Sequence, residues 1–297
     1  EFIQCKSVLS DKNKAIFKRI KPLIFSERGL ETLEIGLLET QVANFNISVA
    51  ATNAFMKAVK DSLDYDLVDP QDGSVVKRLP ARMVFDLIVK MAWRTGDPGL
   101  WFIDKTNNSP ANPIPTLRKI EATNPCGEQP LFNFDVCNLG SIALPRFVLK
   151  NNGGYTVNWE ELERTVRLSV HFLDNVIDKN PYPLPEIMNL AHEIRRIGLG
   201  VMGWADMLAY LGIPYASQEA CDKAEEVSGF INSVGHDESE KLAEIRGSFP
   251  LWDKSIYSSR KQIRNCTITT IAPTGEIRIL AGCCGGIEPP YGLTEIH

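Results

Sequence analysis

The segment NPCGEQPLFNF, residues 124–134, continues directly into DVCNLGSI, residues 135–142. In an extended chain the side chains alternate between two faces, so Asn124, Cys126 and Glu128 would share one face. Positions 124 and 128 would then lie about 13 Å apart at roughly 3.3 Å per residue, which is too far to hold one small ring. The segment must therefore curl if these three side chains are to act together.

Pro125 and Gly127 allow that curl, because proline fixes φ and glycine tolerates positive φ values. We expect a tight loop that turns an amide, a thiol and a carboxylate toward one space. The bare tetrapeptide Asn-Pro-Cys-Gly by itself favours a turn around a structural thiol. Glu128 and a second cysteine, Cys137, shift the balance toward a site of chemistry.

Strand-like and helix-like stretches alternate on both sides of this segment, which predicts an α/β fold with mostly parallel strands. Upstream, the expected elements are a strand at 44–52, a helix from Asn53 to about Ser62, a turn at 69–74, a helix at 81–95 that stops at Gly96, and a buried strand at 99–104. Downstream, they are a helix from Asn158 to about Asp178 with Glu161 in a capping pair, a helix from 181 to Gly198, a helix from Ser217 to Arg246, and a strand that runs into the turn Pro273-Thr274-Gly275.

Composition excludes several classes of protein. The 297 residues are 44% hydrophobic, enough for one large domain or two modest ones. The net charge of −5 argues against a polymeric nucleic acid as partner. No apolar run reaches the roughly 20 residues that span a bilayer, and the first residues lack the apolar region of a signal peptide, so we expect no membrane partner and a cytoplasmic location.

The cysteines and histidines point to thiol chemistry without a metal. The seven cysteines are an odd number in a chain too large to need disulfides, so free or catalytic thiols fit better. The four histidines lack metal-ligand spacing, and no metal site is expected. A simple cysteine nucleophile would need an activating histidine; none is near Cys126 in sequence, although His171, His192 or His236 could approach it in the fold.

NPCGEQPL followed by CNLGSI resembles the active-site loop of ribonucleotide reductases, both the adenosylcobalamin-dependent enzymes and their close class I relatives. The resemblance implies that Cys126 carries a thiyl radical that abstracts the substrate 3′-hydrogen. It implies that Glu128 is the general base on the 3′-hydroxyl and that Asn124 hydrogen-bonds the ribose hydroxyls. Cys137 would be one of two thiols that supply reducing equivalents as the 2′-hydroxyl leaves as water.

The resemblance runs from about Asn44 to Pro289 and implies a fold. Residues 1–43 form a poorly matching helical segment, and residues 44–297 would be part of a ten-stranded α/β barrel of two parallel half-barrels, with the radical cysteine on an internal loop. The second redox thiol, the effector region and a C-terminal cysteine pair would fall outside this chain. We therefore expect a fragment or one piece of a split enzyme, inactive when isolated.

A second segment, IAPTGEIRILAGCCGGIEP at 271–289, is similar to the family segment that binds substrate phosphates. The resemblance makes Pro273, Thr274, Gly275, Glu276 and Ile277 substrate-binding residues. Small hydroxyl residues are expected where Glu276 and Arg278 stand, and serines where Cys284 and Gly285 stand. An ordinary strand and turn therefore stays open as the alternative.

RRIGLGVMGWADML at 195–208 has Gly198, Gly200 and Gly203 in the spacing of a dinucleotide-binding loop. That loop requires a preceding strand, whereas the preceding residues read as helix. The same stretch resembles a ribonucleotide reductase segment in which the glycines allow close packing, and we favour this second reading.

The resemblance implies a ribonucleoside-diphosphate reductase that forms 2′-deoxyribonucleotides for DNA synthesis. Its expected cofactor is adenosylcobalamin, with a thioredoxin-type dithiol as reductant, ATP and deoxynucleoside triphosphates as effectors, and a homo-oligomeric state when complete. Two alternatives stay open. One is a class I large subunit whose radical comes from a metal-containing partner, and the other is a non-catalytic fragment that keeps the fold.

Overall fold

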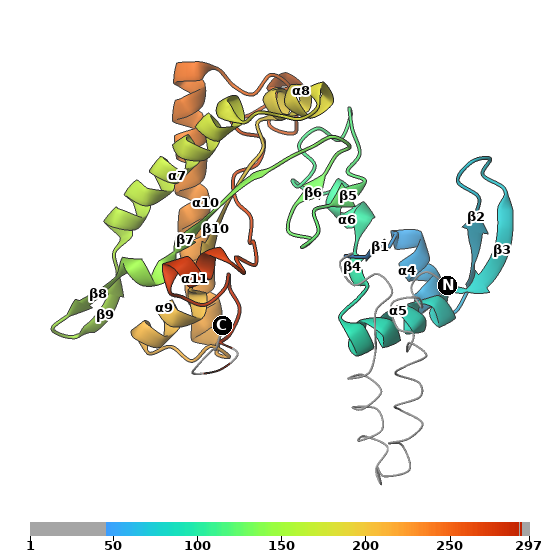
Figure 1. Ribbon diagram of the computed structural model, residues 1–297, viewed down its shortest axis with the longest axis horizontal. Coiled ribbons are helices and arrows are strands. Elements are labelled where there is room, and N and C mark those ends of the chain that lie inside the picture. The colour runs from blue at the N-terminus through green and yellow to red at the C-terminus, as the bar shows by residue number, and fades with distance from the viewer. Residues whose placement is uncertain (1–45, 291, 293–297) are drawn as a thin grey trace, which may run out of the picture. The chain divides into compact units, whose positions relative to one another are not determined.

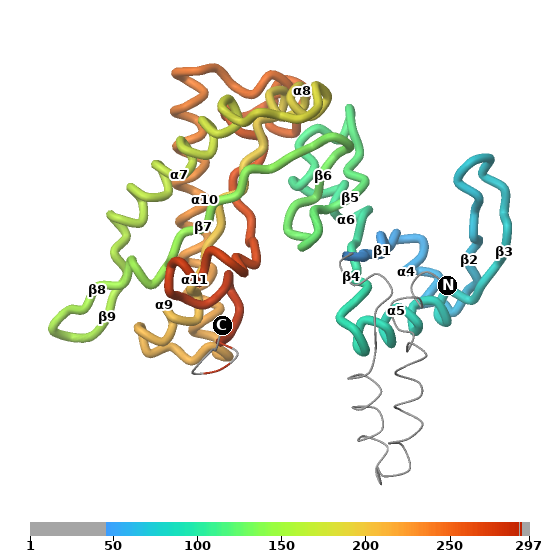
Figure 2. Tube along the Cα trace, in the orientation of Figure 1, coloured from blue at the N-terminus to red at the C-terminus, as the bar shows by residue number. Residues whose placement is uncertain are grey.

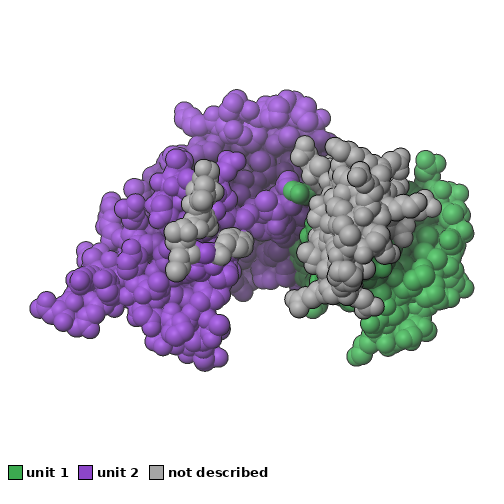
Figure 3. Space-filling model, turned by 60° about the horizontal axis from the view of Figure 1, so that its bottom comes forward, with its two compact units in different colours: residues 1–106 green, residues 107–297 purple. Residues whose placement is uncertain are grey.

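A computed structural model describes residues 46–290 and residue 292 of the chain. The chain divides into two compact units, residues 1–106 and residues 107–297, which Figure 3 shows in two colours. The helical segment expected at residues 1–43, and its boundary with the rest, lie outside the described residues. Within the described part, no helix is both long and apolar enough to cross a membrane.

Unit 1 combines a small parallel sheet, a hairpin and two packed helices. Strands β1 and β4 pair in parallel, with Val49 opposite Leu100. Helices α4 and α5 pack through a small apolar cluster that includes Ala58, Val59 and Ala81. The elements are β1 (Ser48–Ala50), α4 (Asn53–Lys60), β2 (Asp64–Val68), β3 (Val75–Pro80), α5 (Ala81–Thr95), β4 (Gly99–Trp101) and α6 (Ile103–Asn107).

Most sequence expectations for unit 1 are confirmed. Helix α4 begins at Asn53, and α5 ends at Gly96, which takes a left-handed φ of 80°. The expected turn connects β2 to β3 in an antiparallel hairpin whose strands the sequence did not reveal. The buried strand expected at 99–104 is wrong in part, because β4 is short and mostly exposed and α6 begins at Ile103. Asp104 in α6 instead accepts the Asn53 N–H at 2.7 Å and so stabilises the start of α4.

Unit 2 is built on two long helices that pack against a parallel sheet (Figure 1). The larger elements are β7 (Asn138–Ala143), α7 (Trp159–Lys179), α8 (Pro185–Ile194), β10 (Ile197–Met202), α9 (Trp204–Leu211) and α10 (Gln218–Arg246). The shorter ones are β5 (Ala122–Thr123), β6 (Pro130–Leu131), η2 (Leu144–Phe147), β8 (Val148–Asn151), β9 (Gly154–Val157), η3 (Trp252–Lys254) and α11 (Ile277–Ala281). The core joins apolar side chains of β7, α7, β10, α9 and α10.

Strand β10 lies at the centre of this sheet. It pairs in parallel with β7, from Asn138 opposite Ile197 to Ala143 opposite Met202. On its other edge, Leu199 bridges in parallel to Thr269. Figure 2 shows the chain after α10 passing beside β10 on its way to α11. The parallel neighbours in this sheet are thus joined by crossovers that contain helices, as in an α/β barrel wall, although the described strands do not close a barrel.

The helix boundaries follow from capping residues. Asn158 caps α7 by accepting the Glu161 N–H at 3.2 Å, and Ser217 caps α10 by accepting the Ala220 N–H at 3.1 Å, so both predicted starts are confirmed. Helix α10 ends before Gly247, also as predicted. Parallel pairing is confirmed for β1 with β4 and β7 with β10, whereas the three other described strand pairs are short antiparallel hairpins that the sequence did not indicate.

The expectation of a helix running to Gly198 is wrong. Helix α8 ends at Ile194, because Arg195 adopts a left-handed φ of 50°. Residues 197–202 form β10 instead, and every one of them is buried. A Cβ atom on Gly200 would lie 2.5 Å from the Thr270 carbonyl oxygen, so glycine lets two backbones approach closely here. The close-packing role expected for this glycine is confirmed.

Asp174 of α7 is fully buried and joins four segments of unit 2 through hydrogen bonds and ion pairs. Its Oδ1 accepts from Arg195 Nε at 2.8 Å and from Asn265 Nδ2 at 3.0 Å. Its Oδ2 accepts from Arg246 at 3.3 Å and from Arg264 at 3.4 Å. Helices α7 and α10, the turn before β10 and the segment after α10 therefore share one acceptor.

We expect Asp174→Ala to lower the free energy of unfolding by about 3–5 kcal/mol, because it leaves Arg195 in the interior without this carboxylate. Urea denaturation followed by circular dichroism measures the loss. Asp222→Ala, on the exposed surface of α10, is the control, and its effect should stay within about 0.5 kcal/mol. Equal effects of the two substitutions would show that Asp174 does not hold these segments together.

Candidate functional site

Residues 124–129 form a closed loop between the short strands β5 and β6. The Asn124 N–H donates to the Gln129 carbonyl oxygen at 3.1 Å, and the Gly127 N–H donates to the Asn124 carbonyl oxygen at 3.0 Å. Gly127 takes a φ of 85°, a conformation that favours glycine. The curled loop predicted from Pro125 and Gly127 is therefore confirmed.

Asn124 has a structural task that the sequence did not suggest. Its side-chain Oδ1 accepts the Gln129 N–H at 3.0 Å, so the amide closes the loop from inside. The side chain is half-buried, and its Nδ2 group is the part that can still donate to a ligand. Contact between Asn124 and ribose hydroxyls stays a prediction.

The loop presents a thiol and a carboxylate in different environments. Cys126 is exposed, as are its neighbours Pro125 and Gly127. Glu128 is half-buried, and its Oε2 atom is buried with no hydrogen-bond partner among the described residues. A buried carboxylate oxygen without a donor is costly, and a substrate hydroxyl would relieve that cost. One loop thus carries both an accessible sulfur and a carboxylate oxygen that lacks a donor.

The loop is anchored to β10 and to the segment that follows α10. The Thr270 hydroxyl donates to the Glu128 carbonyl oxygen at 3.0 Å. A Cβ atom on Gly198 would lie 2.8 Å from Gln129 Nε2, so the missing side chain makes room for the loop. The glycine spacing that resembled a dinucleotide-binding loop therefore serves packing beneath the cysteine loop.

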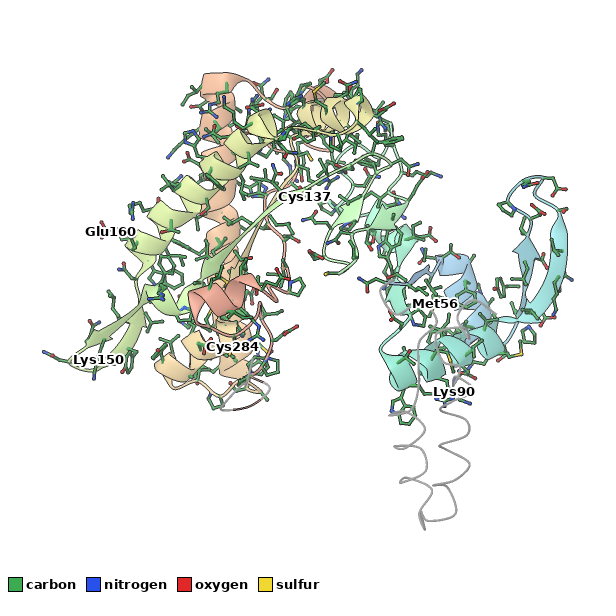
Figure 4. The ribbon with its side chains drawn as sticks, viewed as in Figure 1. Met56, Lys90, Cys137, Lys150, Glu160 and Cys284 are labelled. Atoms are coloured by element: carbon green, nitrogen blue, oxygen red, sulfur yellow. The ribbon has the colours of Figure 1, made fainter. Side chains whose placement is uncertain are left out.

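Cys137 lies immediately before β7, as Figure 4 shows, and is half-buried. Its Sγ is 3.5 Å from the Asn138 carbonyl oxygen, within reach of a weak S–H hydrogen bond. Burial raises the pKa of the Cys137 thiol far above its usual range, while Arg196 opposes this shift. Asp135, Cys266 and Glu128 add to the increase. Cys137 is therefore a neutral thiol at neutral pH and lies within electrostatic reach of Glu128.

Arg196, Asp135 and Cys266 surround Cys137 and were not predicted as site residues. Arg196 Nε donates to Asp135 Oδ2 at 2.9 Å, and both side chains are almost completely buried. Cys266 is fully buried, and burial raises the pKa of its thiol to about 12. Asp135 and Arg196 are 61 positions apart, so no local pattern joins them. The one available sequence signal was that a charged residue, Arg196, directly precedes an apolar run. The sequence pattern alone indicated a helix for that stretch.

The candidate phosphate segment follows Thr270 by a few residues. Thr274 takes a φ of 56° and is buried, and its Oγ1 accepts the Gly286 N–H at 2.8 Å. Gly275, Glu276 and Ile277 are exposed, and α11 begins at Ile277, so the predicted turn and helix start are confirmed. The strand expected before the turn is reduced to the single bridge at Thr269. Binding of phosphate at Pro273 to Ile277 stays a prediction.

The histidines do not support a simple cysteine nucleophile. The contacts of His171 and His236 are to Arg246 and Asn232, and His192 lies 3.8 Å from Asp178. These partners belong to the helical part of unit 2. Among the described residues, none of these three histidines therefore pairs with the Cys126 thiol, and His297 lies outside the described residues.

An apolar cavity of about 700 Å³ lies between β10, α10 and residues 269–271. Its lining includes Leu199, Val227, Ile231 and Thr270. Its volume suits a small molecule. None of the predicted site residues lines it, so the cysteine loop and this cavity meet only at Thr270.

Comparison with known proteins gives one consistent result. Residues 1–263 match a protein-family model described as the barrel domain of ribonucleotide reductase. The vitamin B12-dependent ribonucleoside-diphosphate reductase of Thermoplasma acidophilum is 47% identical over 258 residues, which cover 86% of this chain and 33% of that protein. The enzyme of the same name from Mycobacterium tuberculosis strain H37Rv is 45% identical over 254 residues, covering 86% of this chain and 35% of the relative.

A more distant relative carries a different name. Subunit alpha of the ribonucleoside-diphosphate reductase of Chlamydia trachomatis is 32% identical over 269 residues, covering 75% of this chain and 25% of the relative. The chain thus spans about a third or less of the length of these curated relatives. With the family model matching most of its length, this α/β chain belongs to the ribonucleotide reductase family, in the region of the barrel domain.

Proposed function

We propose that this chain is the central catalytic part of an adenosylcobalamin-dependent ribonucleotide reductase that converts ribonucleoside diphosphates into 2′-deoxyribonucleotides. The observation that carries the proposal is the closed loop 124–129, which holds both an exposed Cys126 and a buried oxygen of Glu128 that has no partner among the described residues. The relatives from Thermoplasma acidophilum and Mycobacterium tuberculosis, at 47% and 45% identity, are both named as vitamin B12-dependent ribonucleoside-diphosphate reductases, which supports the substrate class and the cofactor.

Each loop residue has a distinct role in this reaction. The Cys126 sulfur, as a radical, takes the 3′-hydrogen from the ribose and becomes a thiol. Glu128 accepts the 3′-hydroxyl proton at the carboxylate, and Asn124 donates from Nδ2 to the ribose hydroxyls while its Oδ1 keeps the loop closed. The radical and the base thus act on the same carbon of the sugar.

Cys137 supplies reducing equivalents. Its thiol is neutral at neutral pH, so it holds the hydrogen that accompanies the electron. As the 2′-hydroxyl leaves as water, Cys137 and a second thiol form a disulfide. An external dithiol of the thioredoxin type then reduces that disulfide. The second thiol belongs to a part of the enzyme that precedes residue 1 of this chain.

The substrate diphosphate binds at the turn before α11. The exposed backbone of Gly275, Glu276 and Ile277 offers N–H groups to an anion, and Pro273 shapes the approach. Thr274 fixes the turn through its bond with the Gly286 N–H. The exposed Glu276 carboxylate repels phosphate and weakens this site relative to one with a small hydroxyl residue.

The tip of the cysteine loop is the part of this chain that adenosylcobalamin would reach. Pro125, Cys126 and Gly127 are all exposed, which fits a group that must reach the sulfur from outside the loop. When bound, adenosylcobalamin supplies the radical that oxidises the Cys126 sulfur. The contribution of this chain is to hold that sulfur at a fixed, accessible position, and Pro125 and Gly127 are the residues that would face the cofactor.

The complete enzyme surrounds this chain. We propose that β7, β10 and the segment at 267–270 are part of the wall of a ten-stranded barrel of two half-barrels, with the cysteine loop inside. ATP and deoxynucleoside triphosphate effectors, a homo-oligomeric state and a cytoplasmic location belong to the same proposal. Exposed apolar side chains such as Leu139 on β7 fit a wall that further strands cover.

The test is deoxynucleotide formation by the purified 297-residue chain, alone and with a polypeptide that supplies the preceding part of the reductase. We expect multiple turnovers only with that polypeptide, adenosylcobalamin and a dithiol present. Multiple turnovers by the chain alone would overturn the proposal that the second redox thiol lies outside this chain. Turnover that needs a metal-containing partner would assign a class I large subunit, and no turnover under either condition would assign a non-catalytic fragment.

A further inference from the structure

Cys137, Arg196 and Cys266 form a row across three neighbouring segments of unit 2. Asn138 lies opposite Ile197 in the parallel pairing of β7 with β10. On the other edge of β10, the Ile197 N–H donates to the Thr267 carbonyl oxygen at 3.3 Å. Cys137, Arg196 and Cys266 each precede one of these residues. The arginine therefore stands between two cysteines.

Arg196 is held firmly but is not saturated with hydrogen bonds. Its side chain is 1% exposed; Nε donates to Asp135 at 2.9 Å, and Cζ lies 5.5 Å from the centre of the Phe132 ring. Its Nη2 is buried with no hydrogen-bond partner among the described residues. A buried cation with an unused hydrogen-bond donor is destabilising unless nearby groups can offset its charge, for example by ionising to anions. The cysteines on either side are such groups.

The charges around Cys137 are of opposite sign and come from several segments. Asp135 from the preceding turn, Glu128 from the loop and Cys266 from the neighbouring segment disfavour its thiolate, whereas Arg196 favours it. Tyr257 also lies within electrostatic reach of Arg196 and Cys266, and Arg260 lies within reach of Tyr257. Among the groups that act on Cys137, Arg196 is the cation.

We propose that Arg196 is a positioning residue for the redox chemistry of Cys137: its buried guanidinium, fixed by Asp135, stabilises the thiolate of Cys137 when the redox disulfide is opened. This inference rests on the proposed function for the disulfide step and extends it to a residue outside the cysteine loop. It does not require Arg196 to touch substrate or cofactor.

The step balances with an external dithiol. A thiolate of the dithiol attacks the disulfide at the sulfur of the second redox thiol, and the bond to Cys137 breaks. Cys137 leaves as a thiolate beside Arg196 and then takes a proton. The second sulfur of the dithiol then attacks its first sulfur in the mixed disulfide, so the dithiol becomes a disulfide and the second redox thiol leaves as a thiolate that also takes a proton. A leaving thiolate of lower pKa leaves faster, so the nearby guanidinium accelerates this step.

Cys266 is not the second redox thiol in this arrangement. Neighbouring strands lie about 4.8 Å apart, which places the Cα atoms of Cys137 and Cys266, on the outer two of three segments, roughly 9–10 Å apart. A disulfide needs Cα atoms within about 7 Å. The arginine between the cysteines therefore acts on each of them without bringing them together.

The test measures how fast iodoacetamide alkylates Cys137 as a function of pH, by peptide mass spectrometry on the complete reductase. The thiolate is the reactive form. We expect Arg196→Gln to slow alkylation about tenfold or more, the change expected from one unit of thiol pKa. Arg196→Lys should stay close to wild type. Asp135→Asn should speed alkylation, because it removes a negative charge beside the thiol.

The opposite changes in alkylation rate expected for Arg196→Gln and Asp135→Asn distinguish an electrostatic role of Arg196 from a purely structural one. If the ion pair only held the fold together, Arg196→Gln and Asp135→Asn would both expose Cys137 and both speed alkylation, and the proposal would be overturned. Arg195→Gln is the matched control. It removes a neighbouring buried arginine, which pairs with Asp174 and Asp178 instead, and should leave Cys137 alkylation unchanged.

A second measurement separates this inference from the proposed function. After one turnover, the rate at which dithiothreitol regenerates the Cys137 thiol should fall in Arg196→Gln and stay near wild type in Arg196→Lys. An unchanged regeneration rate in Arg196→Gln would overturn the inference.

Failure of the proposed function can be told apart from failure of this inference. If the wild-type enzyme forms no deoxynucleotide and no disulfide at Cys137, while Arg196→Gln still slows alkylation and Asp135→Asn still speeds it, the action of Arg196 on Cys137 stands and the proposed function fails. If Arg196→Gln does not fold, slower or unchanged alkylation in Asp135→Asn overturns the inference.

Discussion

Replacing Cys126 with serine is expected to abolish ribonucleotide reduction by the complete reductase while nucleotide binding stays close to wild type. A serine hydroxyl is similar in size to the thiol but does not readily form the corresponding radical. The loop should keep its shape, because its hydrogen bonds join Asn124, Gly127 and Gln129 and the position is exposed. Deoxynucleotide formation and equilibrium binding of the substrate nucleotide are the two measurements.

Cys221→Ser is the matched control for this experiment. Cys221 is also an exposed, free cysteine, but it lies on α10, outside the loop. Its substitution should leave both turnover and binding at the wild-type level. Retention of more than a few per cent of reduction by Cys126→Ser would contradict the assignment of the radical to this sulfur.

Glu128→Gln is expected to lower turnover by about 10²–10⁴-fold, the usual loss when a general base is removed, with little change in substrate affinity. The amide keeps the shape of the side chain, and the backbone carbonyl of Glu128 still accepts from Thr270. What is lost is a carboxylate whose Oε2 has no donor of its own in the described structure. Steady-state kinetics with separate kcat and KM values measure the effect.

A neighbouring glutamate provides the control. Glu121 precedes the same hairpin and is exposed, with its carboxylate bonded to Asn133 at 2.6 Å. Glu121→Gln should leave kcat unchanged. A loss confined to KM in Glu128→Gln would show that Glu128 binds substrate and does not take its proton.

Local sequence signals predicted the parts of the fold that local physics determines. Asn158 and Ser217 start helices because their side chains accept the free N–H groups of the first turn, and Gly127 closes the loop because it tolerates a positive φ. The loop around Cys126 was recognised from these features together with its resemblance to ribonucleotide reductases. The proximity of Glu128 to Thr270 was not, because it depends on packing over 142 positions.

The failures have a common physical origin. An apolar run such as residues 197–202 suits a buried helix or a buried strand equally well, and only pairing on both edges makes it β10. The end of α8 depends on Arg195, whose left-handed backbone accompanies its ion pairs with Asp174 and Asp178. Arg196 likewise shows its role only when β10 brings it beside Cys137. Tertiary contacts, which no short pattern encodes, decided each case.

The order of the parallel strands in unit 2 bears on how the polypeptide folds as it is synthesised. Among the parallel strands, β7 comes first along the chain, then β10, which pairs with it, and then residues 267–270, which lie beside β10. Strand β10 and residues 267–270 therefore each leave the ribosome after the strand beside them has been made, and the helices between them can fold first. Because each later strand finds its partner already synthesised, its own apolar edge spends less time open to aggregation.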